Sequence, residues 1–136
     1  MASTLNPYLH FTDNARQALE FYRSVFGGTL RLNSFGDFGA PQSADPDLIM
    51  HGQLDTPGGF TLMASDTPPE MAGTPGTAIS ISLSGTDADE LRGYWDKLVV
   101  GGTVSMPLSA QAWGDEFGMC TDAFGIDWMV DIGPAE

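Results

Sequence analysis

The hydrophobic residues of this chain follow a helical period in two segments. The first apolar stripe, with spacings of three and four, consists of Ala15, Ala18, Leu19, Tyr22, Val25 and Phe26. The second consists of Ala88, Leu91, Tyr94, Trp95 and Leu98. Thr12 or Asp13 can cap the first helix and Asp87 the second, while Gly27 and Gly101 are placed to end them. The pattern predicts two amphipathic helices.

Outside the helices, apolar residues alternate with polar or small ones, which is typical of β-strands. One strand around Leu5–Phe11 precedes the first helix, and another over Ala78–Gly85 precedes the second. The strands expected after the helices cover Gly28–Phe35, Leu48–Thr56, Gly59–Asp66, Gly102–Leu108, Glu116–Thr121 and Asp127–Ile132. The predicted order is one strand, one helix and three strands, twice over.

In four strands the alternation separates an apolar face from a mixed face. The apolar face, which should contact the helices, carries Leu5, Pro7, Leu9, Phe11, Phe60, Leu62, Ala64, Ile79, Ile81, Leu83, Trp128, Val130 and Ile132. The mixed face carries Asn6, Tyr8, His10, Thr61, Met63, Ser65, Ser80, Ser82, Ser84, Asp127, Met129 and Asp131. A curled sheet with its helices outside would leave the mixed face lining a cup. The alternative is a mixed face open to bulk solvent.

The two halves of the chain resemble each other. Tyr8–Leu30 and Ile81–Val104 each contain a strand end, a Thr-Asp pair, a helix with an aromatic pair, and Gly-Gly-Thr before a new strand. Their offset is about 73–74 residues, half the chain. This repeat predicts one domain over residues 1–136, built from modules 4–66 and 77–133 with a Pro/Gly-rich linker at 67–76.

Composition narrows the class of protein. The 136 residues carry a net charge of -13, with 18 acidic against 5 basic residues, which disfavours nucleic acid and anionic membranes as partners. No apolar run reaches the roughly 18–20 residues that span a bilayer, and the N-terminus lacks the pattern of a secretion signal. The single cysteine cannot form an internal disulfide. We therefore expect a cytoplasmic protein.

These features together resemble a known family. The paired modules, with FYRSVFGG at the end of the first helix, resemble the vicinal-oxygen-chelate superfamily, which contains glyoxalase I, bleomycin-resistance proteins and extradiol dioxygenases. PYLHFTDNARQALEFYRSVFGG and WGDEFGMCTDAFGIDWMVDI look like its PhnB-like branch, whose members are often labelled 3-demethylubiquinone-9 3-methyltransferase-like. The resemblance implies an α+β fold, in which two paired βαβββ modules form a curved sheet cup, and a homodimer. The glycines here follow helices, so the chain lacks the glycine-rich loop that a nucleotide-type methyl donor needs.

The resemblance also implies where a metal would bind. Superfamily enzymes hold a divalent metal on four cup-facing positions, usually His, Glu, His or Gln, and Glu. Aligned on the motifs above, these positions fall at Asn6, Met63, Ser80 and Met129. Thioethers suit soft Cu(I), whereas hard or borderline divalent cations prefer carboxylate, imidazole or thiolate. We therefore predict neither a metal nor another cofactor.

Three single residues have alternative interpretations. His10 shares the mixed face and can act as a general base or hydrogen-bond donor, or can be a structural histidine between strand and helix start. His51 is interpreted as structural or exposed on the surface. Cys120 has no neighbouring His or second Cys and is interpreted as a small buried hydrophobe.

The leading hypothesis is a metal-independent member of this superfamily that binds a small organic molecule in its cup. The candidate ligand-binding residues are Asn6, Tyr8, His10, Met63, Ser80, Ser82, Trp113, Phe117 and Met129. The methionines and aromatic residues among them can equally be plain core. One alternative is a metal-dependent lyase, isomerase or dioxygenase with relocated ligands such as His10 with Asp127, Asp131 or Glu116. Another is a protein with a filled cup that serves only to dimerise.

Overall fold

The computed structural model describes residues 5–38, 46–67 and 79–134. Contacts divide the chain into two compact units, Met1–Thr74 and Pro75–Glu136. The predicted linker 67–76 lies outside the described residues except for Thr67. The module boundaries 4–66 and 77–133 therefore stay a prediction.

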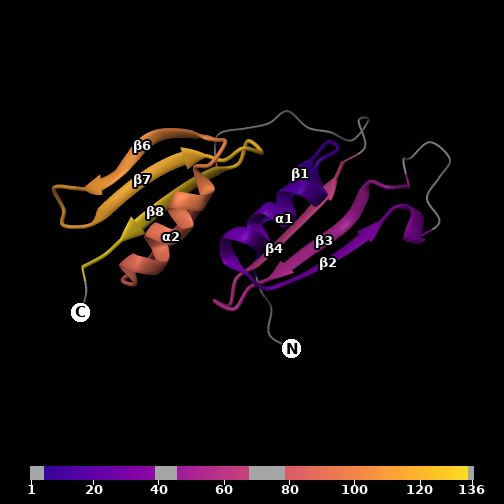
Figure 1. Cartoon of the computed structure of the whole chain (residues 1–136), viewed down its shortest axis with the longest axis horizontal. Coiled ribbons are helices and arrows are strands. Elements are labelled where there is room, and N and C mark those ends of the chain that lie inside the picture. The colour runs from indigo at the N-terminus through magenta and orange to yellow at the C-terminus, as the bar shows by residue number, and fades with distance from the viewer. Residues whose placement is uncertain (1–4, 39–45, 68–78, 135–136) are drawn as a thin grey trace. The chain divides into compact units, whose positions relative to one another are not determined.

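The first unit is a four-stranded sheet with one helix (Figure 1). Its elements are β1 (Tyr8–Phe11), α1 (Ala15–Phe26), β2 (Thr29–Ser34), the short 3-10 helix η1 (Gly36–Phe38), β3 (Ile49–Asp55) and β4 (Thr61–Asp66). The strand order is β1-β4-β3-β2, with β1 parallel to β4 and the other pairs antiparallel.

The second unit repeats this topology. Its elements are β5 (Ile81–Gly85), α2 (Ala88–Leu98), β6 (Thr103–Ala110), β7 (Glu116–Thr121) and β8 (Asp127–Ile132). The strand order is β5-β8-β7-β6, with β5 parallel to β8. The predicted repeat and the α+β class are confirmed. None of the helices in the described part of the chain is both long and apolar enough to cross a membrane.

Each helix covers one face of its own sheet. All six residues of the predicted α1 stripe are buried, and α1 contacts β2, β3 and β4. In α2 the residues Leu91, Trp95 and Leu98 are buried, while Ala88 and Tyr94 are half-buried. A Cβ on Gly52 would lie 2.3 Å from Leu19 of α1, so this side of β3 faces the helix. We call the other side of each sheet its open face.

Two strands begin later than the sequence pattern predicts. β1 starts at Tyr8 and β5 at Ile81, so Asn6 and Ser80 precede the strands rather than lying on their faces. Leu5 is 100% exposed and Ile79 is 83% exposed, although both were expected on the buried face. Alternation without a cross-strand partner is insufficient to form a strand, because extended backbone needs ladder hydrogen bonds.

The two helices are capped differently. The predicted caps Thr12 and Asp13 of α1 are wrong, because the N-cap position is Asn14 and its side chain makes no capping hydrogen bond. Instead the Ala15 amide donates to Asp66 Oδ1, at 2.9 Å, from the end of β4. For α2 the prediction is confirmed, since Asp87 Oδ1 accepts from the Glu90 amide at 3.1 Å.

Candidate functional site

The open face of the first sheet is built around a row of cross-strand partners. Met63 on β4 pairs with Tyr8 on β1 and with Gln53 on β3. Because side chains alternate along a strand, His10 and His51 lie on the same face as Tyr8 and Gln53. Tyr8 is 41% exposed and Met63 is half-buried, so the row remains accessible within this unit.

Three rings form a cluster on this face, which we call the Tyr8 cluster: Tyr8, His10 and His51. The Tyr8 hydroxyl and His51 Nδ1 are 3.3 Å apart and share a hydrogen bond. The Tyr8 ring centroid is 5.3 Å from that of His10 and 5.8 Å from that of His51. His10 Nδ1 is hydrogen-bonded to Thr67 Oγ1 at 3.1 Å, so it reaches the end of β4 rather than the helix start. The cluster combines aromatic surface with groups that can donate and accept hydrogen bonds.

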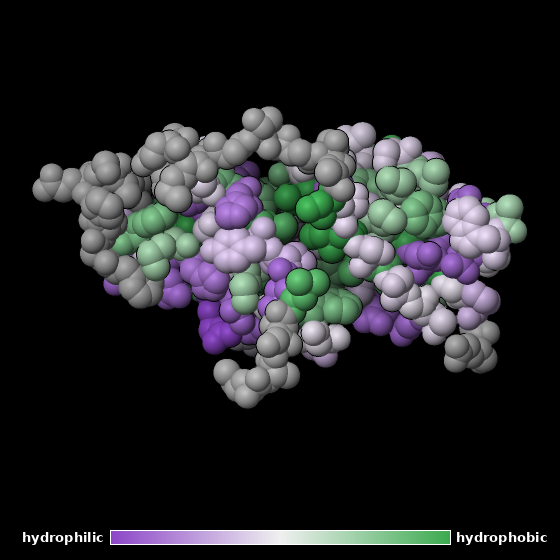
Figure 2. Space-filling view, turned by 180° about the vertical axis from the view of Figure 1, so that it is seen from behind, coloured by the Kyte–Doolittle hydropathy of each residue, from purple (hydrophilic) through white to green (hydrophobic). Residues whose placement is uncertain are grey.

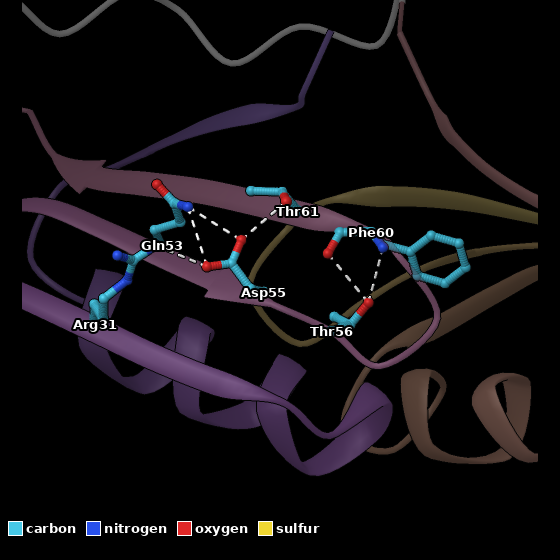
Figure 3. Close-up of polar contacts among 6 residues, drawn as sticks. All are labelled: Arg31, Gln53, Asp55, Thr56, Phe60 and Thr61. Carbon is cyan, nitrogen blue, oxygen red and sulfur yellow. Dashed lines mark hydrogen bonds and ion pairs between the residues drawn. The ribbon is translucent and has the colours of Figure 1, made fainter. Parts of the chain in front are cut away.

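The carboxylate of Asp55, two residues after Gln53 on β3, already accepts hydrogen bonds from neighbouring side chains (Figure 3). Gln53 Nε2 donates to Asp55 Oδ1 at 3.0 Å, Thr61 Oγ1 donates to the same oxygen at 3.0 Å, and Arg31 Nη2 donates to Oδ2 at 2.8 Å. These hydrogen bonds, led by the one from Gln53, lower the pKa of Asp55. Asp55 therefore holds the Gln53 amide in place and is a poor candidate for a general base.

The open face of the second sheet has different chemistry. Met129 on β8 pairs with Ser82 on β5 and with Met119 on β7. Along β8, Asp127 and Asp131 flank Met129 on the same face. Figure 2 shows hydrophobic and polar residues side by side over this unit. Asp127 Oδ1 accepts from the Thr121 hydroxyl at 2.6 Å.

An aromatic pair lies next to a pair of carboxyl groups on this sheet. Trp113 is 63% exposed, and its ring centroid is 6.1 Å from that of Phe117 in an edge-to-face arrangement. Phe117 pairs across the strands with Asp131. A hydrogen bond shared with Asp115, together with burial and the charge of Asp115, raises the pKa of Asp131. Asp131 Oδ1 is shielded from solvent and has no hydrogen-bond partner among the described residues.

The structure brings the sequence-predicted residues together in two groups, each within its own unit. Tyr8, His10 and Met63 form the first group, with Asn6 just before its strand. The second group contains Ser82, Trp113, Phe117 and Met129, with Ser80 just before its strand.

Sequence reasoning missed the role of His51 in the first group. His51 is half-buried against Tyr8, which fits its interpretation as a structural histidine better than the alternative of an exposed one. The signal was present, because His51 and Gln53 alternate with the buried residues Gly52 and Leu54 along β3.

Cys120 fits its interpretation as a buried hydrophobe. It is 2% exposed, and burial raises its pKa to about 11. Its thiol is therefore inert at neutral pH.

Comparison with known proteins decides the family. The model of the Glyoxalase/Bleomycin resistance protein/Dioxygenase superfamily matches residues 4–130. The chain belongs to this superfamily. The resemblance drawn from its sequence is thereby confirmed.

Several relatives cover nearly the whole chain. Protein YjdN from Escherichia coli (strain K12) is 29% identical over 140 residues, which cover 94% of this chain and 94% of YjdN. The solved structure of PA1353 from Pseudomonas aeruginosa is 40% identical, with a TM-score of 0.86 and coverage of 98% of this chain and 100% of PA1353. The PhnB protein from Bacillus cereus is 20% identical, with a TM-score of 0.73 and coverage of 96% and 100%. At that identity the likeness to PhnB concerns the fold alone.

At the positions that the resemblance aligns with the superfamily's metal ligands, the residues do not fit a divalent cation. In the sheets, Met63 has Tyr8 and Gln53 as neighbours, and Met129 has Ser82 and Met119. None of these offers a carboxylate, imidazole or thiolate. Across the described residues, no three His, Cys, Asp or Glu side chains are close enough to hold a metal ion. Glu116, one of the proposed relocated ligands, forms an ion pair with Arg92.

Proposed function

We propose that this protein is a member of the superfamily that binds a small organic molecule on the open face of its first sheet without a divalent metal. The ligand lies over Met63 and beside the Tyr8 cluster.

The observation that carries this proposal is the Tyr8–His51 hydrogen bond next to a half-buried methionine. Ligand sites combine apolar surface with a few polar groups held in fixed orientation. The His51 contact orients the Tyr8 hydroxyl, and the Thr67 contact orients His10. Met63 adds polarizable, adaptable surface at the centre of the row.

Ligand-induced thermal shifts test the proposal. Purified protein is treated with EDTA and screened against a library of small aromatic and polar molecules. We expect hits whose shift is unchanged by EDTA. For such a hit, Tyr8→Phe removes one hydrogen bond, worth about 0.5–1.5 kcal/mol, and should weaken binding about two- to twelve-fold.

Matched variants separate the ligand site from general stability. His51→Gln should weaken binding to a similar degree as Tyr8→Phe, because it removes the ring that orients the hydroxyl. Thr56→Ser, in the turn before β4, keeps the hydroxyl that bonds the Phe60 backbone (Figure 3) and should leave binding unchanged. Hits that need added Mn²⁺, Ni²⁺ or Zn²⁺, or that ignore both variants, would refute the proposal.

We also propose that the protein forms a homodimer in the cytoplasm, with neither nucleic acid nor membrane as a partner. The net charge of -13 supports the last two statements, because phosphates and anionic lipids repel an acidic surface. Light scattering on the purified protein at several concentrations tests the dimer. A mass that stays monomeric would exclude it.

A further inference from the structure

Three methionines lie in register across neighbouring strands of the second sheet. Met119 on β7 pairs with Met129 on β8 and with Met106 on β6. Met106 is 40% exposed, and the other two are half-buried. We call these three residues the methionine row. Ser82 on β5 continues the row beyond Met129.

A β-bulge creates the row. Val104 on β6 pairs with Cys120 on β7. In a regular antiparallel ladder, the next residue, Ser105, would then lie opposite Met119. Met106 would then lie opposite Gly118. A Cβ on Gly118 would be directed at Trp95 of α2, so this position belongs to the face that the helix covers. The register shift between Val104 and Met106 instead places Met106 opposite Met119. Bulges re-aim side chains in this way and are frequent beside functional sites.

Strand spacing allows the three sulfur atoms to meet. Partners on adjacent strands have Cβ atoms about 4.5–5.5 Å apart, so the two outer methionines are separated by roughly 10 Å. Methionine is unbranched with three rotatable bonds, so both outer side chains can lean toward Met119. In such rotamers the three thioethers would lie together over the middle strand.

The chemistry of three thioethers selects a particular ion. Thioether sulfur is a soft, neutral ligand that favours Cu(I) over Mg²⁺, Ca²⁺ or Mn²⁺. Asp127 and Asp131 flank Met129 on the same face and add negative charge near the row. The negative charge attracts a cation to the row. The carboxylate oxygens are hard ligands, so a soft ion prefers the sulfur atoms to them.

We propose that the methionine row is a binding site for a soft monovalent cation of the Cu(I) or Ag(I) type. The proposal does not depend on the organic ligand proposed for the first sheet. It shares one residue, Met129, with the positions that the resemblance aligns with the superfamily's divalent metal. The donors are the sulfur atoms of Met106, Met119 and Met129. No bond is made or broken in the protein, and the ion keeps its oxidation state.

Silver titration of the full chain tests this site, because Ag(I) is a redox-stable probe. Calorimetry in chloride-free buffer should detect one equivalent. In parallel, carbon-labelled methionine methyl groups should be followed by NMR. Of the seven methionines, those at 106, 119 and 129 should shift, while Met50 and Met63 should not. All measurements use a Cys120→Ala background, which removes the thiol as a competing ligand.

Met119→Leu removes the central donor at nearly constant volume, so the fold should persist. Its Ag(I) affinity should fall at least about tenfold, whereas Met63→Leu should not change it. Thioethers do not titrate, so the affinity should be the same at about pH 5.5 and about pH 7.5.

Three results would overturn the proposal. The first is the absence of Ag(I) binding in the Cys120→Ala background. The second is binding that Met119→Leu leaves unchanged. The third is shifts confined to methionines other than 106, 119 and 129.

Discussion

The two units share one topology but start their helices by different means. In the second unit, Asp87 caps α2 from the adjacent position in sequence. In the first unit, the cap of α1 is Asp66, 51 residues along the chain from Ala15. Asp66 is 3% exposed and also accepts from the Ile49 amide at 2.8 Å. One carboxylate thus ties together α1, β3 and β4, a role that Asp87 does not have.

The open faces of the units differ as well. The first presents the Tyr8 cluster, and the second presents the methionine row between carboxylates. Apart from the buried Asp66, the buried residues that face the helices are apolar in both units, because they pack against the apolar side of a helix. The repeat therefore preserves the faces that pack against the helices. The open faces differ in their side chains, aromatic rings in the first unit and thioethers in the second.

The largest effect should come from removing the distant cap. Asp66→Ala leaves the buried Ala15 and Ile49 amides without an acceptor, at a cost of about 2–4 kcal/mol. Urea unfolding followed by circular dichroism measures the free energy of unfolding. Asp66→Asn keeps one acceptor oxygen and should lose about half as much. A loss below about 1 kcal/mol for Asp66→Ala would contradict the assigned role.

Two of the glycines that face the helices, Gly118 and Gly52, should respond differently to alanine. On Gly118 a Cβ would lie 2.9 Å from the Leu108 backbone, which cannot yield easily. Gly118→Ala should therefore destabilise by about 1–3 kcal/mol. On Gly52 the clash is with the end of the Leu19 side chain, so Gly52→Ala should cost less. Thermal melts of both variants check this order, and the reverse order would show that Leu19 is as rigid as backbone.

The local cap should matter less than the distant one. Asp87→Ala removes the acceptor of the Glu90 amide at an exposed helix start, where water can replace it. We expect a loss of about 1 kcal/mol in urea unfolding. If this loss equalled that of Asp66→Ala, the proposed contrast between the two helix starts would be wrong.

The smallest expected effect is a gain in stability, from the substitution Asp131→Asn. The pKa of Asp131 is raised in the folded protein by the hydrogen bond that it shares with Asp115. A folded-state pKa above the unfolded value means that stability falls as pH rises past about 3.9, and stays lower at neutral pH. Asp131→Asn should therefore stabilise the protein at pH 7, by no more than about 1 kcal/mol for a partly solvated pair.

The pH dependence checks the assignment to Asp131. The gain from Asp131→Asn should disappear well below pH ~3.9, where the Asp131 carboxyl is neutral in both folded and unfolded states. Melting curves from acid to neutral pH provide the measurement. An equal gain at every pH would assign the effect to packing instead.

Periodicity in the sequence was sufficient to predict the order of the helices and strands. The α1 stripe from Ala15 to Phe26 and the strands Glu116–Thr121 and Asp127–Ile132 were predicted with the observed bounds, because burial on one face enforces the pattern. The family resemblance was also available from the motifs.

Three features could not be predicted from the sequence, because they depend on residues that are far apart in the chain. The Asp66 cap joins α1 to the end of β4. Alternation along β3 is enough to place His51 on the open face, but only the pairing of the strands brings it to Tyr8, 43 positions away on β1. The bulge in β6 is a property of strand pairing, so nothing in the local sequence places Met106 opposite Met119.

The central claim is that the superfamily's metal positions have lost the ability to hold a divalent cation. Elemental analysis tests it most directly, after purified protein is incubated with Mn²⁺, Fe²⁺, Ni²⁺ or Zn²⁺ and then dialysed. The account predicts no stoichiometric divalent metal in any sample. One tightly bound equivalent per subunit that disappears in His10→Ala would contradict it.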